Sequence, residues 1–128
     1  MAEGNTPAPD GAAGIREDPV TGIARKDSSM VVSVAGELDL YNAHALREAL
    51  LDCCDEAPER LVVDLSEVKF IDSTALGVLI EARTRMPNRR AFLLAAPGLE
   101  TRRALEISGL DRHFVVHDSL DEALSAAV

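Results

Sequence analysis

Two short runs of the sequence, residues 61–65 (Leu-Val-Val-Asp-Leu) and 91–95 (Ala-Phe-Leu-Leu-Ala), have apolar residues at consecutive rather than alternate positions. Successive side chains of a β-strand point to opposite faces, so such a run is buried on both faces when helices cover a sheet on each side. The runs therefore predict central strands of an α/β sheet. This expectation constrains the fold more strongly than any other feature of the chain.

Segments with apolar residues at helical spacing precede, separate and follow these runs. Residues 21–26 and 30–35 predict an edge hairpin, and residues 114–116 a short last strand. The alternation predicts an α/β domain with a mixed, mostly parallel sheet of four to five strands packed with about four helices. Four helices are expected. The first follows Asn42, an N-cap candidate, and ends before Pro58, and the second covers roughly residues 73–85. The third covers residues 99–108, with Gly109 after its end, and the fourth follows Ser119, which forms a capping box with Glu122.

The start of the chain differs in composition from the rest. Half of the eight Gly and half of the six Pro residues fall in the first 22 positions, where no apolar period is present. We expect a disordered tail over residues 1–20 and a single domain over residues 21–128, because 128 residues leave room for one core.

Charge and composition exclude several classes of protein. The formal net charge is −9, which repels a phosphate backbone and argues against nucleic acid as a partner. No apolar run approaches the 18 or so residues of a membrane span. Cys53 and Cys54 are neighbours and cannot join distant segments, which favours a reducing compartment, and no signal-peptide pattern is found. We therefore expect a cytoplasmic protein.

The segment Asp72-Ser73-Thr74 is the strongest candidate for a functional site, because it places a carboxylate and two hydroxyls where a helix is expected to begin. The unpaired N–H groups and the positive dipole end at such a place tolerate an anion, so a phosphate on Ser73 is locally acceptable. The structural alternative is that Asp72 or Ser73 simply caps the helix.

The run that follows, residues 75–80, has no polar residue for nearly two helical turns. A helix that is apolar all round is covered on more than one side, by neighbouring elements or by a partner. An exposed Leu76 beside Ser73 would mark an interface, and burial within the fold is the alternative.

Three segments of the chain carry a resemblance to a known family. These are residues 36–39 (Gly-Glu-Leu-Asp), residues 68–79 around Asp72-Ser73-Thr74, and residues 103–110 (Arg-Ala-Leu-Glu-Ile-Ser-Gly-Leu). In order and spacing they resemble the STAS domains, and among these the bacterial anti-sigma factor antagonists, from about Met30 to the end of the chain. The resemblance implies the STAS fold. It also implies that an anti-sigma factor serine kinase phosphorylates Ser73, that the unphosphorylated form binds this kinase and frees a sigma factor, and that the phosphorylated form releases the kinase.

The resemblance also implies which residues meet the kinase. It places the loop that ends in Asp39 beside the phosphoacceptor. For Asp39, a strand-ending turn residue bonded to its own backbone is the alternative reading. One departure is that this chain has Ser73-Thr74-Ala75 where the family often has Ser-Ser-Gly, which makes Thr74 a competing phosphoacceptor. The expected partner-binding residues are Asp39, Asp72, Ser73, Thr74 and Leu76.

Competing functions fit the residues less well. A response-regulator receiver would use Asp64 as phosphoacceptor but needs an acidic pair for Mg²⁺, which Glu37 and Asp39 do not form. A nucleophilic Ser73 lacks the Gly-x-Ser-x-Gly context and a histidine placed as a base, and no phosphate-binding glycine loop is present. We expect no catalysis and no cofactor or metal. A STAS module that serves as a scaffold without switching stays open as the alternative function.

Overall fold

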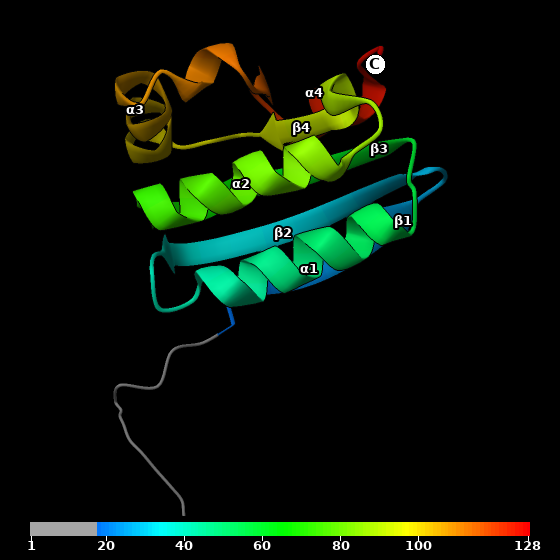
Figure 1. Ribbon diagram of the computed structural model, residues 1–128. Helices are drawn as coiled ribbons and strands as arrows, with labels where there is room; N and C mark the ends of the chain where they lie inside the picture. Colours follow the sequence, from blue (N-terminus) through cyan, green and yellow to red (C-terminus); the bar gives the residue numbers. More distant parts are fainter. Residues whose placement is uncertain (1–17) are drawn as a thin grey trace, which may run out of the picture.

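The computed structural model describes residues 18–128 (Figure 1). Most of the expected tail, residues 1–17, lies outside the described residues. The end of the expected tail, residues 19–20, already belongs to the domain. Pro19 is buried, its carbonyl accepts a hydrogen bond from the Ala35 N–H at 2.9 Å, and Val20 opens the first strand.

The sheet has five strands in the order β1-β2-β3-β4-β5. The β1–β2 pair is antiparallel and the other pairs are parallel, which confirms the predicted mixed, mostly parallel sheet. Within residues 18–128, four α-helices and two short 3₁₀ segments accompany the strands, and the last helix follows the last strand. The strands are β1 (Val20–Lys26), β2 (Ser29–Leu38), β3 (Arg60–Ile71), β4 (Phe92–Ala95) and β5 (Val115–His117); the helices are α1 (Ala43–Asp55), α2 (Ser73–Arg85), α3 (Leu99–Ile107) and α4 (Leu120–Ser125), with η1 (Arg89–Ala91) and η2 (Leu110–Arg112).

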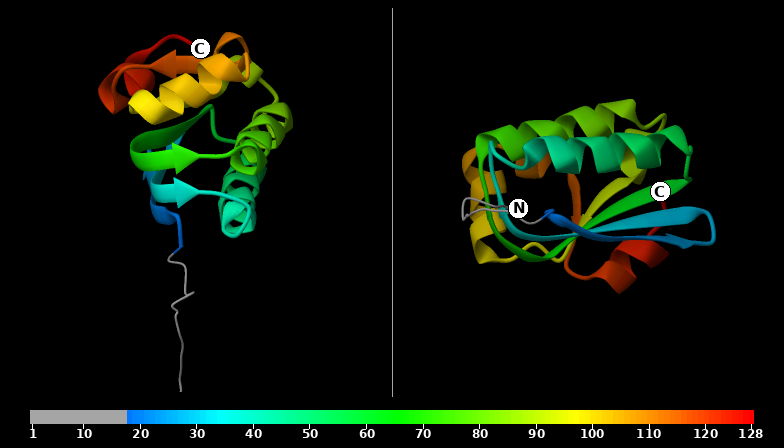
Figure 2. Two further views of the ribbon diagram at one scale, coloured as in Figure 1. Left: turned by 90° about the vertical axis from the view of Figure 1, so that its left-hand side faces the viewer. Right: turned by 90° about the horizontal axis from the view of Figure 1, so that it is seen from below.

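Helices cover both faces of the central strands, as the apolar runs predicted. On one face, side chains such as Val63 and Leu94 pack against α1 and α2, which lie side by side. On the other face, Val62 and Leu93 pack against Ala123 of α4, on the opposite side of the sheet in Figure 2. Within residues 18–128, no helix is long and apolar enough to cross a bilayer.

Strand β3 is longer than the sequence pattern predicted. The apolar run ends at Leu65, but the strand continues to Ile71 and stays paired with β2 through two register shifts. Strand β4 accompanies β3 only as far as Asp64, opposite Ala95, so the extension has a single neighbour. Exposed polar side chains are tolerated there because no second strand covers the extension, and they interrupt the apolar pattern from which the strand was predicted. The extension brings the ends of β2 and β3 level with each other.

The helix ends agree with the expected caps in part. Gly109 is left-handed, with φ of 77°, and its N–H donates to the Glu106 carbonyl at 3.0 Å, as expected after a helix end. The Ser119 hydroxyl accepts from the Glu122 N–H at 3.1 Å. Asn42 occupies the N-cap position of α1, but its side chain makes no capping bond and serves the preceding loop instead.

Candidate functional site

The site lies at the carboxyl ends of β2 and β3, on the left in Figure 1. Leu38 and Ile71 are register partners in the sheet, and the Asp72 N–H donates to the Leu38 carbonyl at 3.0 Å. The sheet therefore delivers loop 39–42 and the first turn of α2 to the same place. This confirms that Asp39 and Asp72 emerge from neighbouring strand ends.

Asp72 joins loop 39–42 to α2 through both of its carboxylate oxygens. It is the N-cap of α2, with extended backbone, and its Oδ1 accepts from the Ala75 N–H at 3.0 Å. Its Oδ2 accepts from the Leu40 N–H at 3.1 Å. The capping alternative is therefore confirmed for Asp72, and the same side chain also fixes the position of the neighbouring loop.

Ser73 is the first residue of α2 and is exposed, as is Thr74. No hydrogen bond of the Ser73 hydroxyl is found within residues 18–128. The side chain therefore stands at the positive end of the helix dipole, where the first N–H groups of a helix lack intrahelical partners. This is the geometry that the sequence predicted for a site that accepts an anion.

Loop 39–42 is held by hydrogen bonds of its own. Asp39 is half-buried, its Oδ1 accepts from the Tyr41 N–H at 3.0 Å, and its N–H donates to the Asn42 Oδ1 at 2.9 Å. The buried Asn42 side chain also donates to the Glu37 carbonyl at 2.7 Å. The turn reading of Asp39 is thus confirmed, and the loop presents a fixed shape beside Ser73.

Leu76 requires a correction. Its side chain is only 6% exposed and belongs to the main core, so it is not the exposed contact residue that the sequence suggested. The apolar run is covered because α2 packs beside α1 on one face of the sheet, and Ile80 alone among the large side chains of the run is exposed. Ala75 is fully buried too, so its departure from the family pattern puts no methyl group on the surface.

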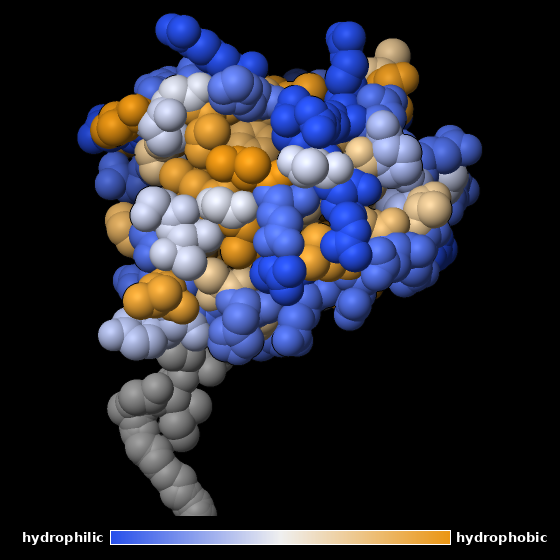
Figure 3. Space-filling view, viewed as in Figure 1, coloured by the Kyte–Doolittle hydropathy of each residue, from blue (hydrophilic) through white to orange (hydrophobic). Residues whose placement is uncertain are grey.

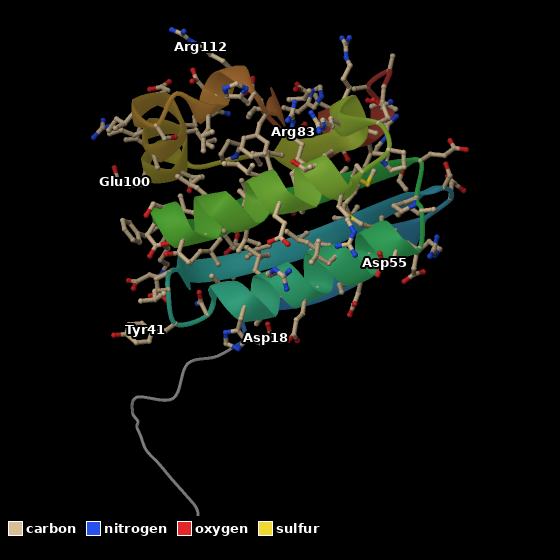
Figure 4. All side chains as sticks on the ribbon, viewed as in Figure 1. Asp18, Tyr41, Asp55, Arg83, Glu100 and Arg112 are labelled. Atoms are coloured by element: carbon tan, nitrogen blue, oxygen red, sulfur yellow. The ribbon has the colours of Figure 1, made fainter. Side chains whose placement is uncertain are left out.

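Sequence reasoning missed the exposed apolar residues around the site. Leu40 and Tyr41 are 66% and 70% exposed, and Leu99, the first residue of α3, is 69% exposed. Figure 4 places Tyr41 and Glu100, the neighbour of Leu99, at the end of the molecule where α2 begins. The available signal was apolar residues in loop 39–42 and at the first position of a helix, which mark contact surfaces when they cluster.

The acidic, histidine and cysteine side chains do not gather into a metal site in the part of the chain that the structure describes. No group of three or more His, Cys, Asp or Glu side chains that could hold a metal ion is found among residues 18–128. The Asp64 carboxylate lies within β3 and accepts a hydrogen bond from the Ser66 N–H at 3.0 Å.

These features define a class: a small α/β domain with a mixed five-stranded sheet, which displays a serine at a helix start and exposed apolar side chains at the same end of the molecule. Residues 22–123 match the STAS domain family, and the chain belongs to this family. The resemblance seen in the sequence is thereby confirmed.

Several relatives of the chain are named as anti-sigma factor antagonists. The chain is 35% identical over 103 residues to the anti-sigma-F factor antagonist RsfB of Mycobacterium tuberculosis, covering 80% of this chain and 84% of RsfB. The crystal structure of an anti-sigma factor antagonist from Mycobacterium paratuberculosis is similar with a TM-score of 0.76 and 36% identity, over 80% of this chain and 88% of that one. The Bacillus cell fate determinant SpoIIAA in its phosphorylated form shares the fold at 17% identity, with a TM-score of 0.61, over 80% and 95% of the two chains.

Proposed function

We propose that the chain is an anti-sigma factor antagonist that switches partners through Ser73. In the unphosphorylated state it binds an anti-sigma factor serine kinase in the cytoplasm, and the kinase releases its sigma factor. Phosphorylation of Ser73 abolishes this binding. The single observation that carries the proposal is the exposed Ser73 hydroxyl at the first residue of α2, in a chain similar to named antagonists.

The switch follows from where the new charge would be placed. Phosphorylation adds about −1.5 to −2 charges near neutral pH. The helix start accommodates this charge without unfolding the domain, because the dipole and the free N–H groups favour an anion. A partner surface pressed against Ser73 would have to desolvate the dianion beside the carboxylates of Asp39 and Asp72. The change therefore acts on binding and leaves the fold intact.

The contact surface that we propose combines polar and apolar parts. Its polar centre is Asp39, Asp72, Ser73 and Thr74, as the resemblance implied. Its apolar rim is Leu40, Tyr41 and Leu99, which take the contact role that the buried Leu76 is unable to fill. Exposed apolar side chains around a polar centre provide the area that a protein interface buries. The protein would act by binding and not by catalysis.

Mapping the modified residue tests the proposal. The purified protein is incubated with its cognate anti-sigma factor kinase and ATP, and the product is analysed by mass spectrometry. We expect one phosphate, on Ser73, which disappears in Ser73→Ala. Thr74→Ala is the matched control, because it removes the neighbouring hydroxyl and should leave phosphorylation intact.

The alternative function gives a different result. If the protein binds its partner but takes up no phosphate, or takes it up on Thr74 or elsewhere, then the Ser73 switch is wrong. Stable binding without any modification would favour the STAS scaffold that does not switch.

A further inference from the structure

We propose that the domain has a second docking surface, which binds an acidic protein segment. One large apolar side chain of this segment enters the surface, and the carboxylates that flank it in the segment bind the positively charged rim. The surface is a groove between α2 and η2, with a volume of about 240 Å³. We call it the α2–η2 groove. Its lining residues are Ile80, Arg83, Leu110, His113 and Phe114.

The floor of the α2–η2 groove is apolar and firmly anchored. Phe114 is only 5% exposed, and its ring packs on Phe92 of the core with ring centroids 6.1 Å apart. Ile80 is 40% exposed and Leu110 is half-buried. Figure 3 shows apolar side chains gathered above α2, toward the α3–η2 segment, with strongly hydrophilic side chains along their edge. The floor is thus an extension of the core that reaches the surface.

The size of the groove selects among occupants. Sites for drug-sized ligands enclose about 300–1,000 Å³ and bury most of the ligand. A groove of about 240 Å³ that is open to solvent instead fits a single large side chain, such as Leu or Phe, from a longer segment. An apolar anchor in a small pocket is the usual centre of a protein contact.

The rim carries positive charge in a chain whose net charge is −9. Among residues 18–128, no salt bridge or side-chain hydrogen bond is found for Arg83 or His113, which stand at opposite sides of the groove. Arg112 of η2 points outward from the top of the molecule in Figure 4, away from Arg83. The nearest carboxylate along α2, Glu81, is already paired with Arg47 at 2.8 Å. Unpaired guanidinium groups favour carboxylates, which they bind in bidentate fashion.

The α2–η2 groove and the Ser73 site are far enough apart to act separately. Ser73 and Arg83 are ten residues apart on α2, which corresponds to about 15 Å along a helix axis. Charges on the surface are largely screened beyond about 8 Å at physiological ionic strength. The groove therefore binds its segment equally well before and after phosphorylation of Ser73, and the two proposals succeed or fail independently.

A nuclear magnetic resonance titration tests the inference. The ¹⁵N-labelled protein is titrated with the hexapeptide Asp-Glu-Leu-Phe-Glu-Asp, and with the peptide in which Lys replaces every acidic residue. We expect the acidic peptide alone to shift the amide signals of Ile80, Leu110 and His113. We expect Arg83→Glu to weaken binding by about tenfold or more, because an attractive pair becomes a repulsive one.

Two matched variants complete the experiment. Lys26→Glu makes the same change of charge at an exposed residue of β1 with no ion pair in the described chain, and should leave the affinity unchanged. Ser73→Asp should also leave it unchanged. Binding of the Lys-containing peptide, an unchanged affinity in Arg83→Glu, or shifts scattered over the surface would overturn the inference. So would binding of phosphatidylglycerol vesicles with no response to the acidic peptide.

Discussion

Replacement of Asp72 by alanine removes both acceptors that join loop 39–42 to α2. Loss of the N-cap bond from the Ala75 N–H lowers the free energy of unfolding by about 1 kcal/mol. Loss of the bond from the Leu40 N–H lowers it by about 1 kcal/mol more. We therefore expect Asp72→Ala to cost about 2 kcal/mol. Asp72→Asn should cost about half of this, because asparagine caps a helix as well as aspartate does, but would turn an amide donor toward Leu40.

Urea unfolding followed by circular dichroism measures these costs, and amide hydrogen exchange locates them. The Leu40 amide should exchange faster in both Asp72 variants. Ser119→Ala is the matched control, since it removes the cap of α4 at a cost of about 1 kcal/mol and should leave the exchange of Leu40 unchanged. The reasoning is refuted if the free energy of unfolding of Asp72→Ala lies within about 0.5 kcal/mol of the wild-type value, or if the Leu40 amide exchanges at the wild-type rate.

Three further predictions follow from burial and charge. Leu76→Ala should lower the free energy of unfolding by about 3 kcal/mol, measured in urea, because the side chain fills the core; a loss of partner binding at unchanged stability would contradict its burial. The hydrogen bond from Arg47 lowers the pKa of the Glu81 carboxyl, so the ionised pair contributes stability above the ordinary carboxyl pKa and loses it as the pH falls through the lowered value. A carboxyl titration by nuclear magnetic resonance should show this midpoint rising in Arg47→Met, and an unmoved midpoint would count against the pair. Burial raises the pKa of the Cys53 thiol to about 11 and also raises that of Cys54, so neither should react with the thiol reagent DTNB at about pH 8 until urea unfolds the domain. Fast reaction of the native protein would show that the thiols are accessible.

The sequence predicted the elements whose pattern is local and repeated. Residues 61–65 and 92–95 lie in buried strands, because their apolar side chains belong to the core on one face of the sheet or the other; Asp64 is half-buried, and Ala91 belongs to η1. The left-handed Gly109 and the cap at Ser119 were also predictable, since turn chemistry depends on a few neighbouring residues.

Features that depend on contacts between distant segments were not predictable in the same way. Strand β3 extends to Ile71 because β2 lies beside it, although exposed residues interrupt its apolar pattern. Asn42 has the residue type of an N-cap, but its side chain instead accepts from the Asp39 N–H and donates to the Glu37 carbonyl at the end of β2. The apolar run of α2 could be covered by a partner or by the fold, and only the packing of α1 and the sheet shows that Leu76 is inside.

At the site, the position of Ser73 was predictable and its surroundings were not. The polar triplet after an apolar strand pointed to a helix start, where the structure places it. The second role of Asp72, as acceptor for the Leu40 N–H, needs the register of β2 against β3. The rim residue Leu99 joins the site only through the position of α3.

The affinity of the protein for its cognate anti-sigma factor, measured by calorimetry before and after stoichiometric phosphorylation of Ser73, tests the central claim most directly. The proposed switch predicts binding that weakens by about tenfold or more, with thermal unfolding still cooperative and Ser73→Ala still bound in the presence of ATP. Equal affinity of the two forms, or loss of binding that accompanies unfolding of the domain, would contradict it.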